Sequence, residues 1–270
     1  MMLELISFSC MVCFCFAKEA IILGSSGLVG GLVLQNMLAD PIWSKIHIIV
    51  RRPATIRHSK INEILITQMS EMETDSQLLE LASTSDGAID TAVVTLGVNE
   101  PFGWKIKKLV DIEVDLTSKF TKFCRSQLGV KYLGVMTMAG TTRGSPLLTE
   151  DLQTEITYSN IFTLAPRVKG EVEEAVLAQG FTHTSFFRPA NFETDEYRFG
   201  FIDVFMQFFC SILNFVLPSE YHSIHVRHIA EAMAADAAAF VTGNTEEAKE
   251  MIHHYDEMMA IVSRKTHEGL

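Results

Sequence analysis

Residues 18–30, KEAIILGSSGLVG, place an apolar run directly before a glycine-rich loop. The run at 18–23 is rich in Ile and ends at a glycine, as is typical of a buried parallel strand. Residues 28–39 then repeat apolar side chains at helical spacing, so the loop joins a strand to a helix. The remaining predicted strands are 45–50, 63–67, 92–96, 132–136 and 182–187, and the remaining predicted helices are 110–126 and 167–178. Because strands and helices alternate, we predict an α/β fold with a doubly wound parallel sheet.

The composition favours one large domain over a disordered, fibrous or disulfide-rich chain. The 270 residues are 48% hydrophobic and 20% charged, which is enough apolar material to fill a core. The net charge is −11, so no nucleic-acid partner is expected, because duplex binding normally needs a basic surface. Five cysteines are too few and too unevenly placed for a disulfide framework, which predicts a reduced, cytoplasmic protein.

Residues 1–17 are expected to be an apolar extension that precedes a single domain at 18–270. The run at 5–17 has the length of a signal-peptide core, but no Lys or Arg precedes it. It is too short to span a bilayer, which takes roughly 20 residues, and weak membrane association is the alternative. Cys10 and Cys13 are spaced like a redox or metal pair, but no second pair with ligand spacing follows, so no metal site is predicted.

A G-x-x-G-x-x-G motif lies between the first predicted strand and the first predicted helix. Glycines in this context allow a tight turn, close approach of the backbone to a pyrophosphate, and close packing of helix on sheet. The free N–H groups at the helix start then face the anion. We therefore predict dinucleotide binding, with a structural turn that binds nothing as the alternative. The predicted cofactor-binding residues of the loop are Gly24, Ser25, Ser26, Gly27, Leu28, Val29 and Gly30.

The residues after the second strand bear on the choice of dinucleotide. An NAD-selective site normally places Asp or Glu there, roughly 20 residues past the loop, to bind the ribose 2′-OH. This chain has Arg51 and Arg52 instead. Because a guanidinium group suits a 2′-phosphate, NADP(H) is the predicted cofactor, and a solvated basic turn is the alternative.

Several stretches in this order resemble the atypical short-chain dehydrogenase/reductase superfamily, and most closely the Tat-interacting-protein-like oxidoreductases, which are related to NmrA-like proteins. The resemblance implies a Rossmann-type fold with NADP(H) laid across the carboxyl ends of the strands. It also implies that Leu96 and Gly97 contact the cofactor. The matching stretches are ILGSSGLVG (22–30), IIVRRP (48–53), VVTLG (93–97), RVKGEVEEAV (167–176) and SFFRPANF (185–192), with a weaker match at HSIHVRHIAEAM (222–233).

The same resemblance implies a Ser/Thr–Tyr–Lys active site. Lys169 matches the lysine that holds the nicotinamide ribose and lowers the pKa of the tyrosine, and Thr137 matches one of the hydroxyl positions. The neighbouring position, Met138, could equally be the catalytic one. The tyrosine belongs four residues before the lysine, where this chain has Ala165. No phenol there can act as general acid or base. Tyr158 could take its place only if the loop before the helix folds back.

These features predict an NADP(H)-binding, dehydrogenase-like protein with a degenerate catalytic centre and a regulatory or redox-sensing role. The alternative is an active NADPH-dependent reductase of a small carbonyl compound, with Thr137, Tyr158 or water as proton donor. A third hypothesis is an adaptor that no longer binds nucleotide, against which the intact glycine loop argues.

From about residue 190 the chain is predicted to form a C-terminal helical elaboration around the substrate cleft. Residues 200–217 are strongly apolar with a polar stripe at helical spacing, which predicts a helix that covers this cleft. An exposed surface at 201–216 for a protein partner, for self-association or for a membrane is the alternative.

Two groups of polar residues in the second half of the chain are predicted to have structural roles only. His222, His225 and His228 surround a predicted strand-to-helix junction and do not share a helix face with a third ligand. The acidic residues at 171, 173 and 174 are predicted to lie on a solvated helix face.

Overall fold

The computed structural model describes residues 18–98, 101–194, 217–243 and 250–268. Its centre is a parallel sheet of seven strands in the order β3-β2-β1-β4-β5-β6-β9. The strands are β1 (Lys18–Leu23), β2 (Trp43–Val50), β3 (Ile61–Leu65), β4 (Ile89–Val94), β5 (Tyr132–Met136), β6 (His183–Phe187) and β9 (Glu250–His253). The predicted doubly wound parallel fold is confirmed. The strand order reverses between β1 and β4, and in such sheets ligands bind at the carboxyl ends of the strands at that point.

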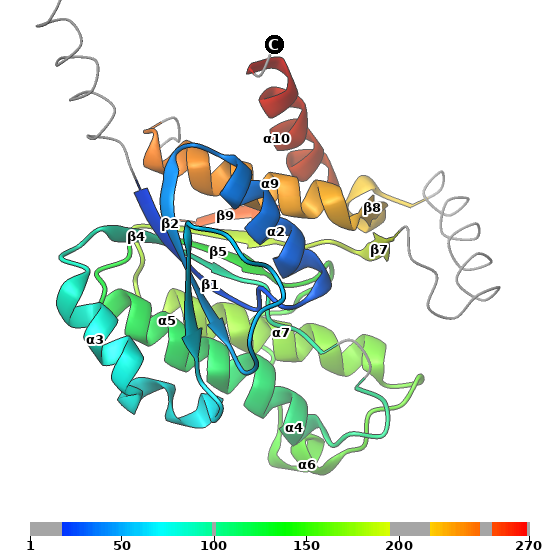
Figure 1. Ribbon diagram of the computed structural model, residues 1–270. Helices are drawn as coiled ribbons and strands as arrows, with labels where there is room; N and C mark the ends of the chain where they lie inside the picture. The colour runs from blue at the N-terminus through cyan, green and yellow to red at the C-terminus, as the bar shows by residue number, and fades with distance from the viewer. Residues whose placement is uncertain (1–17, 99–100, 195–216, 244–249, 269–270) are drawn as a thin grey trace, which may run out of the picture.

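Helices cover both faces of this sheet (Figure 1). On one face lie α2 (Leu28–Ala39) and α9 (Val226–Val241), with α10 (Tyr255–Glu268) packed against α9. On the other lie α3 (Ser76–Thr84), α5 (Leu116–Ser126) and α7 (Ile161–Leu177). Each face has its own buried apolar cluster, because alternate residues of the buried strands point to opposite sides of the sheet.

The helix predicted at 110–126 begins earlier and contains an irregular turn. It runs as α4 (Ile106–Val110), a π-helical turn (Asp111–Asp115) and then α5. A short helix, α6 (Thr149–Gln153), packs near α4, and 3-10 turns occur at Met69–Thr74 and Ser219–Tyr221.

The start predicted for the helix at 167–178 is wrong. Helix α7 begins at Ile161, so Pro166 lies inside the helix rather than in its first turn. Proline has no N–H, so residue 166 donates no hydrogen bond within the helix. The carbonyl of Pro166 is used elsewhere, since it accepts from the backbone N–H of Thr142 at 3.1 Å.

The C-terminal elaboration adds a small parallel pair, β7 (Asn191–Glu193) with β8 (Ser223–His225), before α9. The strand-to-helix junction predicted around the histidines is confirmed, because β8 ends at His225 and α9 begins at Val226. The extension at 1–17 and the apolar segment at 201–216 lie outside the described residues. Across the described helices, none has both the length and the apolar character needed to cross a bilayer.

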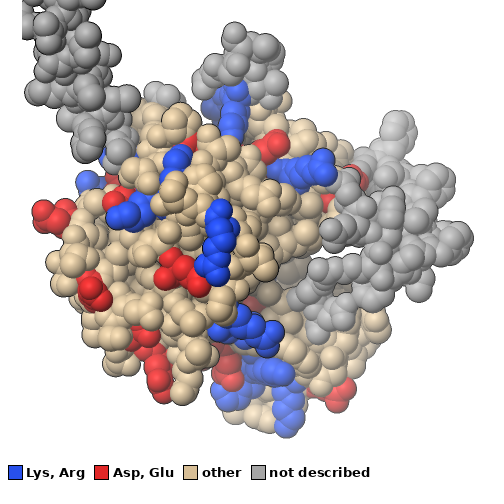
Figure 2. Space-filling model, viewed as in Figure 1, with Lys and Arg blue, Asp and Glu red and all other residues tan. Residues whose placement is uncertain are grey.

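Charged side chains of both signs are interspersed on the face that Figure 2 shows. In the four described ranges, no group of three or more His, Cys, Asp or Glu side chains is arranged to hold a metal ion.

Candidate dinucleotide site

The glycine loop makes the turn from β1 into α2. Gly24 has a φ of +99°, a backbone conformation that glycine adopts without steric cost. The N–H of Gly27 donates to the carbonyl of Gly24 at 2.9 Å. A Cβ added at Gly30 would collide with this same carbonyl and with Oγ1 of Thr95. The loop therefore packs so closely on the end of β4 that residue 30 must lack a side chain.

The start of α2 leaves polar groups available to an anion. Gly27 occupies the N-cap position, and no side chain caps the first turn. The N–H groups of the first turn can therefore donate hydrogen bonds to an anion. The hydroxyl of Ser25 is buried and has no hydrogen-bond partner in the described part of the chain. Because an unpaired buried hydroxyl is costly, this group suits a phosphate oxygen as its acceptor. The residues present thus fit the pyrophosphate of a dinucleotide.

Arg51 and Arg52 follow β2 at the same edge of the sheet. Leu23 of β1 lies opposite Ile49 of β2, so the residues just beyond both strands are neighbours. Both arginines are exposed, and neither makes a hydrogen bond or ion pair with another described residue. Two guanidinium groups are therefore free beside the glycine loop.

The glycine loop packs against the residue that follows β4. The N–H of Thr95 donates to the carbonyl of Leu23 at 2.9 Å, and Thr95 is the residue that contacts Gly24 and Gly30. Leu96 and Gly97 follow the strand, half-buried and exposed respectively. Thr95 lies inside the stretch VVTLG but was not among the predicted site residues.

Lys169 lies on α7 and forms a buried ion pair with Glu113, which was not among the predicted site residues. Its Nζ is 2.8 Å from Oε2 of Glu113, and the two side chains are 12% and 6% exposed. The other oxygen of Glu113 accepts from the backbone N–H of Val98 at 3.0 Å. The apolar pattern gave no signal for its burial: Leu109 and Thr117, four residues away on either side, are both buried, but only Leu109 is apolar.

Thr137 follows β5 and is buried. Its Oγ1 donates to Oε1 of Glu173 at 2.9 Å, so the hydroxyl already has an acceptor. Glu173 is fully buried and is also bound by Arg143 and Arg188. The predicted solvated position of this acidic residue is therefore wrong. Two arginines and a threonine from other elements offset the cost of burying its charge.

Neither residue 165 nor residue 158 places a tyrosine side chain beside Lys169. Ala165 presents only a methyl group one turn before the lysine. Tyr158 is 76% exposed and stacks on Phe102, with ring centroids 4.1 Å apart. It precedes the first residue of α7, and the helix rises roughly 12 Å from there to Lys169.

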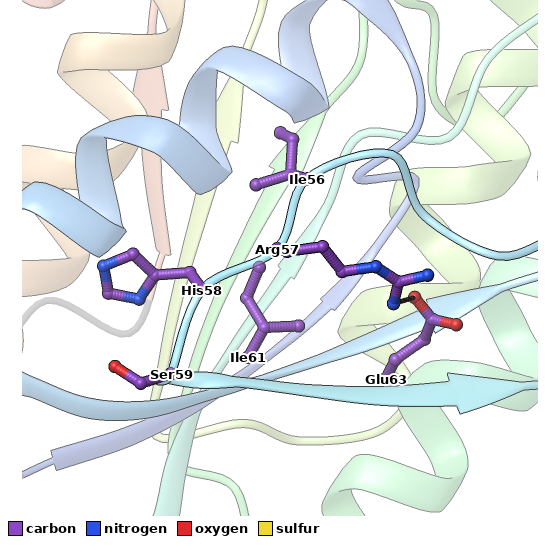
Figure 3. Close-up of a pocket in the computed structure, with 6 residues that line it drawn as sticks. All are labelled: Ile56, Arg57, His58, Ser59, Ile61 and Glu63. Atoms are coloured by element: carbon purple, nitrogen blue, oxygen red, sulfur yellow. Dashed lines mark hydrogen bonds and ion pairs between the residues drawn. The ribbon is translucent and has the colours of Figure 1, made fainter.

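A hollow of about 440 Å³ lies beside β3, away from the glycine loop in the chain. In Figure 3, Arg57 and Glu63 point toward each other while His58 points away from both. The Arg57–Glu63 pair is 3.5 Å long and Arg57 is 73% exposed. The hollow therefore has no strongly buried polar group that would mark a ligand site. Its lining residues are Ile56, Arg57, His58, Ser59, Ile61 and Glu63.

Solved structures share the fold at low sequence identity. MoeE5 in complex with UDP-glucose and NAD is 14% identical, with a TM-score of 0.55 over 93% of this chain and 82% of that one. The enzyme WbmH of Bordetella bronchiseptica in complex with NAD⁺ is 15% identical, with a TM-score of 0.54 over 88% of this chain and 75% of that one. A UDP-N-acetylglucosamine 4-epimerase from Bacillus cereus is 12% identical, with a TM-score of 0.55 over 92% of this chain and 83% of that one. At these identities the likeness shows a Rossmann-like fold.

Curated fungal proteins match part of the sequence. The protein fmp52, mitochondrial, of Emericella nidulans is 25% identical over 173 residues, which are 62% of this chain and 64% of the relative. The protein of the same name from Aspergillus niger is 29% identical over 170 residues, again 62% of this chain and 64% of the relative. The match thus spans less than two thirds of these relatives. No protein-family model matches the sequence.

Proposed function

We propose that this protein binds NADP(H) at the β1–α2 loop. The observation that carries the proposal is the glycine loop itself, with its left-handed Gly24, its side-chain-free Gly30 and the unpaired hydroxyl of Ser25. The exposed Arg51 and Arg52 favour the phosphorylated dinucleotide over NAD(H). MoeE5 and WbmH, which share the fold, are both solved in complex with NAD, which supports a nicotinamide dinucleotide as the ligand class.

We further propose that the catalytic centre is degenerate and that binding serves a regulatory or redox-sensing role. Bound NADPH would supply a hydride, but reduction of a carbonyl also needs a proton at its oxygen. Ala165 offers none, the Thr137 hydroxyl donates to Glu173, and Tyr158 stacks on Phe102 outside the helix. General acid–base catalysis is worth about 10²–10⁴-fold in rate, so slow turnover is expected.

An active NADPH-dependent reductase of a small carbonyl compound is the alternative, and the buried Lys169–Glu113 pair favours it. Lysine carries three N–H donors, of which this pair accounts for one. The others remain available to a ribose or to a carbonyl oxygen. Lys169 and, in this alternative, Thr137 are the proposed catalytic residues.

A screen for NADPH oxidation separates the two. The purified full chain, at a concentration where NADPH is bound, is mixed with a panel of aldehydes and ketones, and absorbance of the reduced nicotinamide is followed. We expect binding without appreciable oxidation. Robust oxidation would overturn the degenerate centre while leaving dinucleotide binding intact.

The compartment is a separate proposal. Composition predicts the cytoplasm, whereas the fungal relatives are named as mitochondrial proteins, which makes the mitochondrion the first compartment to test. Imaging the full chain with a fluorescent tag at its C-terminus, together with a mitochondrial marker, decides between the two.

A further inference from the structure

The ion pair between Lys169 and Glu113 is largely buried. The two side chains are 12% and 6% exposed, and their charged atoms are 2.8 Å apart. Removing two charges from water costs several kcal/mol for each ion, so such a pair persists only where its remaining polar atoms also find partners. Glu113 meets this condition, since its second oxygen accepts the N–H of Val98.

Glu113 occupies the π-helical turn between α4 and α5, and it is the buried residue of that turn. π-helical turns are rare and occur frequently at functional sites. The other acidic residue that opens the turn, Asp111, points to the surface and pairs with Lys107, where both side chains are about half exposed. Of the three acidic residues in this turn, only Glu113 is buried, whereas Asp111 is partly exposed and Asp115 is exposed.

The two oxygens of Glu113 join α7 to the segment beside the glycine loop. Val98 comes three residues after Thr95, the residue whose hydroxyl lies against Gly24 and Gly30. Gly97 lies between them, and a Cβ there would be 3.8 Å from Oε1 of Glu113. The carboxylate thus holds the Lys169 ammonium next to the end of β4, at the carboxyl edge of the sheet.

We propose that Glu113 is a positioning residue for Lys169 at the nicotinamide end of the dinucleotide site. It takes one of the three N–H donors of the ammonium and leaves two for the ribose hydroxyls of the ligand. This inference rests on the proposed dinucleotide site. It adds that Glu113 contributes to binding of the nicotinamide half of the ligand through Lys169 and does not contribute to binding of the adenosine half.

The variant Glu113→Gln tests this, with NADPH and 2′,5′-ADP as two probes. In glutamine an NH2 group replaces one of the two carboxylate oxygens, so either Val98 or Lys169 faces a donor in place of its acceptor, and the negative charge is lost. The fragment 2′,5′-ADP lacks the nicotinamide ribose and should depend on the glycine loop and the arginines alone. We expect NADPH affinity to fall about 10-fold or more, as for a lost charged hydrogen bond, and that for 2′,5′-ADP to change less than about 2-fold.

The matched control is Asp111→Asn, which removes an exposed ion pair from the same π-helical turn and should leave both affinities unchanged. Equal weakening of both probes in Glu113→Gln would show a purely structural role and overturn the inference. Failure of the unmodified chain to bind either probe would overturn the proposed function as well.

A second variant keeps the test decisive if Glu113→Gln does not fold. Lys169→Met removes the other half of the pair, and the same selective loss of NADPH affinity is expected. An unchanged ratio of the two affinities would overturn the inference. Where both variants fold, the double variant should bind NADPH no more weakly than Lys169→Met alone, because the two residues act as one unit.

Discussion

At the scale of single residues, Arg51 and Arg52 carry the predicted selectivity for NADP(H). Both guanidinium groups are exposed beside the glycine loop. Replacing both with Ala should weaken NADPH binding by about 1.5–3 kcal/mol, as expected for lost charged hydrogen bonds, and leave NADH binding nearly unchanged. Titration calorimetry measures both. Arg57→Ala is the matched control, because Arg57 is an exposed arginine of the same loop that pairs with Glu63.

Ala165 carries the predicted loss of proton transfer. Replacing it with Tyr puts a phenol one helical turn before Lys169, where the two side chains can meet. We expect Ala165→Tyr to raise NADPH oxidation above that of the unmodified chain by up to about 10²-fold, the lower range for a general acid. A single-wavelength absorbance assay with one aldehyde suffices.

Tyr158 is the proton donor in the alternative hypothesis of an active reductase, and Tyr158→Phe tests it directly. Because it is 76% exposed, Tyr158→Phe should not change stability. If the unmodified chain oxidises NADPH and this substitution abolishes the rate, the loop before α7 folds back in solution and the degenerate-centre proposal is wrong.

At the scale of elements, α9 is fixed to the sheet by one carboxylate. Asp236 accepts from the phenol of Tyr132 at 2.7 Å and from Oγ of Ser185 at 2.6 Å. Burial raises the pKa of the Tyr132 phenol, so it remains a donor at neutral pH. The ring reaches Asp236 because Gly134 has no side chain, and a Cβ there would be 3.0 Å from the phenol oxygen.

Asp236→Ala should therefore lower the free energy of unfolding by roughly 1–3 kcal/mol for each hydroxyl left without an acceptor. Denaturant unfolding measures this loss. Adding Tyr132→Phe and Ser185→Ala to the same chain should cost less than the sum of the single changes, since no buried donor then remains unpaired. Strict additivity would contradict this account of how α9 is held.

The same buried layer makes stability depend on pH. His183 and His253 are each 4% exposed, and desolvation lowers the pKa of both below 6.5, partly offset by the charge of Asp236. Each pKa is lower in the folded chain than in the unfolded chain, so the unfolded chain binds more protons as the pH falls below 6.5. Stability is fully present above about pH 6.5 and declines as the pH falls from there.

The measurement is the melting temperature at pH 7.5 and 5.5. His253→Phe is the informative variant, because neither ring nitrogen of His253 has a hydrogen-bond partner in the described part of the chain and the ring stacks on Phe187. The difference between the two pH values should be smaller in this variant. His47, whose pKa burial also lowers, keeps part of the dependence in both chains.

At the scale of the whole molecule, local pattern was enough for the layered fold and for the glycine loop. Periodicity located β1 and α2 at their observed ends, because an Ile-rich run and a helical repeat meet at one loop. It missed β9, whose four residues, EMIH, are too short to show a period and gain their place only by pairing with β6.

Two of the buried carboxylates could not be predicted in the same way. Glu113 and Glu173 are held by partners far along the chain, Lys169 and the arginines at 143 and 188. Before the fold is known, an acidic residue in a helical pattern is most simply placed in solvent, because burying it alone is costly. The roles that the resemblance assigned to Thr137 and Lys169 stay predictions.

Residues 1–17 are predicted to be dispensable. The first strand starts at Lys18, whose N–H donates to Ile42 and whose Nζ pairs with Asp90. A chain beginning at Met11 or at Lys18 should melt near the temperature of the full chain and bind NADPH as tightly. A drop of more than about 2–4 °C, equivalent to about 1 kcal/mol in a domain of 150–250 residues, would show that the segment belongs to the core.

The measurement that tests the central claim most directly is a calorimetric titration of the full chain with NADPH and NADH in parallel. The glycine loop and the two exposed arginines after β2 predict that NADPH and NADH bind at the same single site in each chain. NADPH should bind more tightly by about 10-fold or more, the worth of a charged hydrogen bond to the 2′-phosphate. Equal affinities would contradict the selectivity, and absence of heat with either ligand, supported by unchanged melting temperatures, would contradict the dinucleotide site itself.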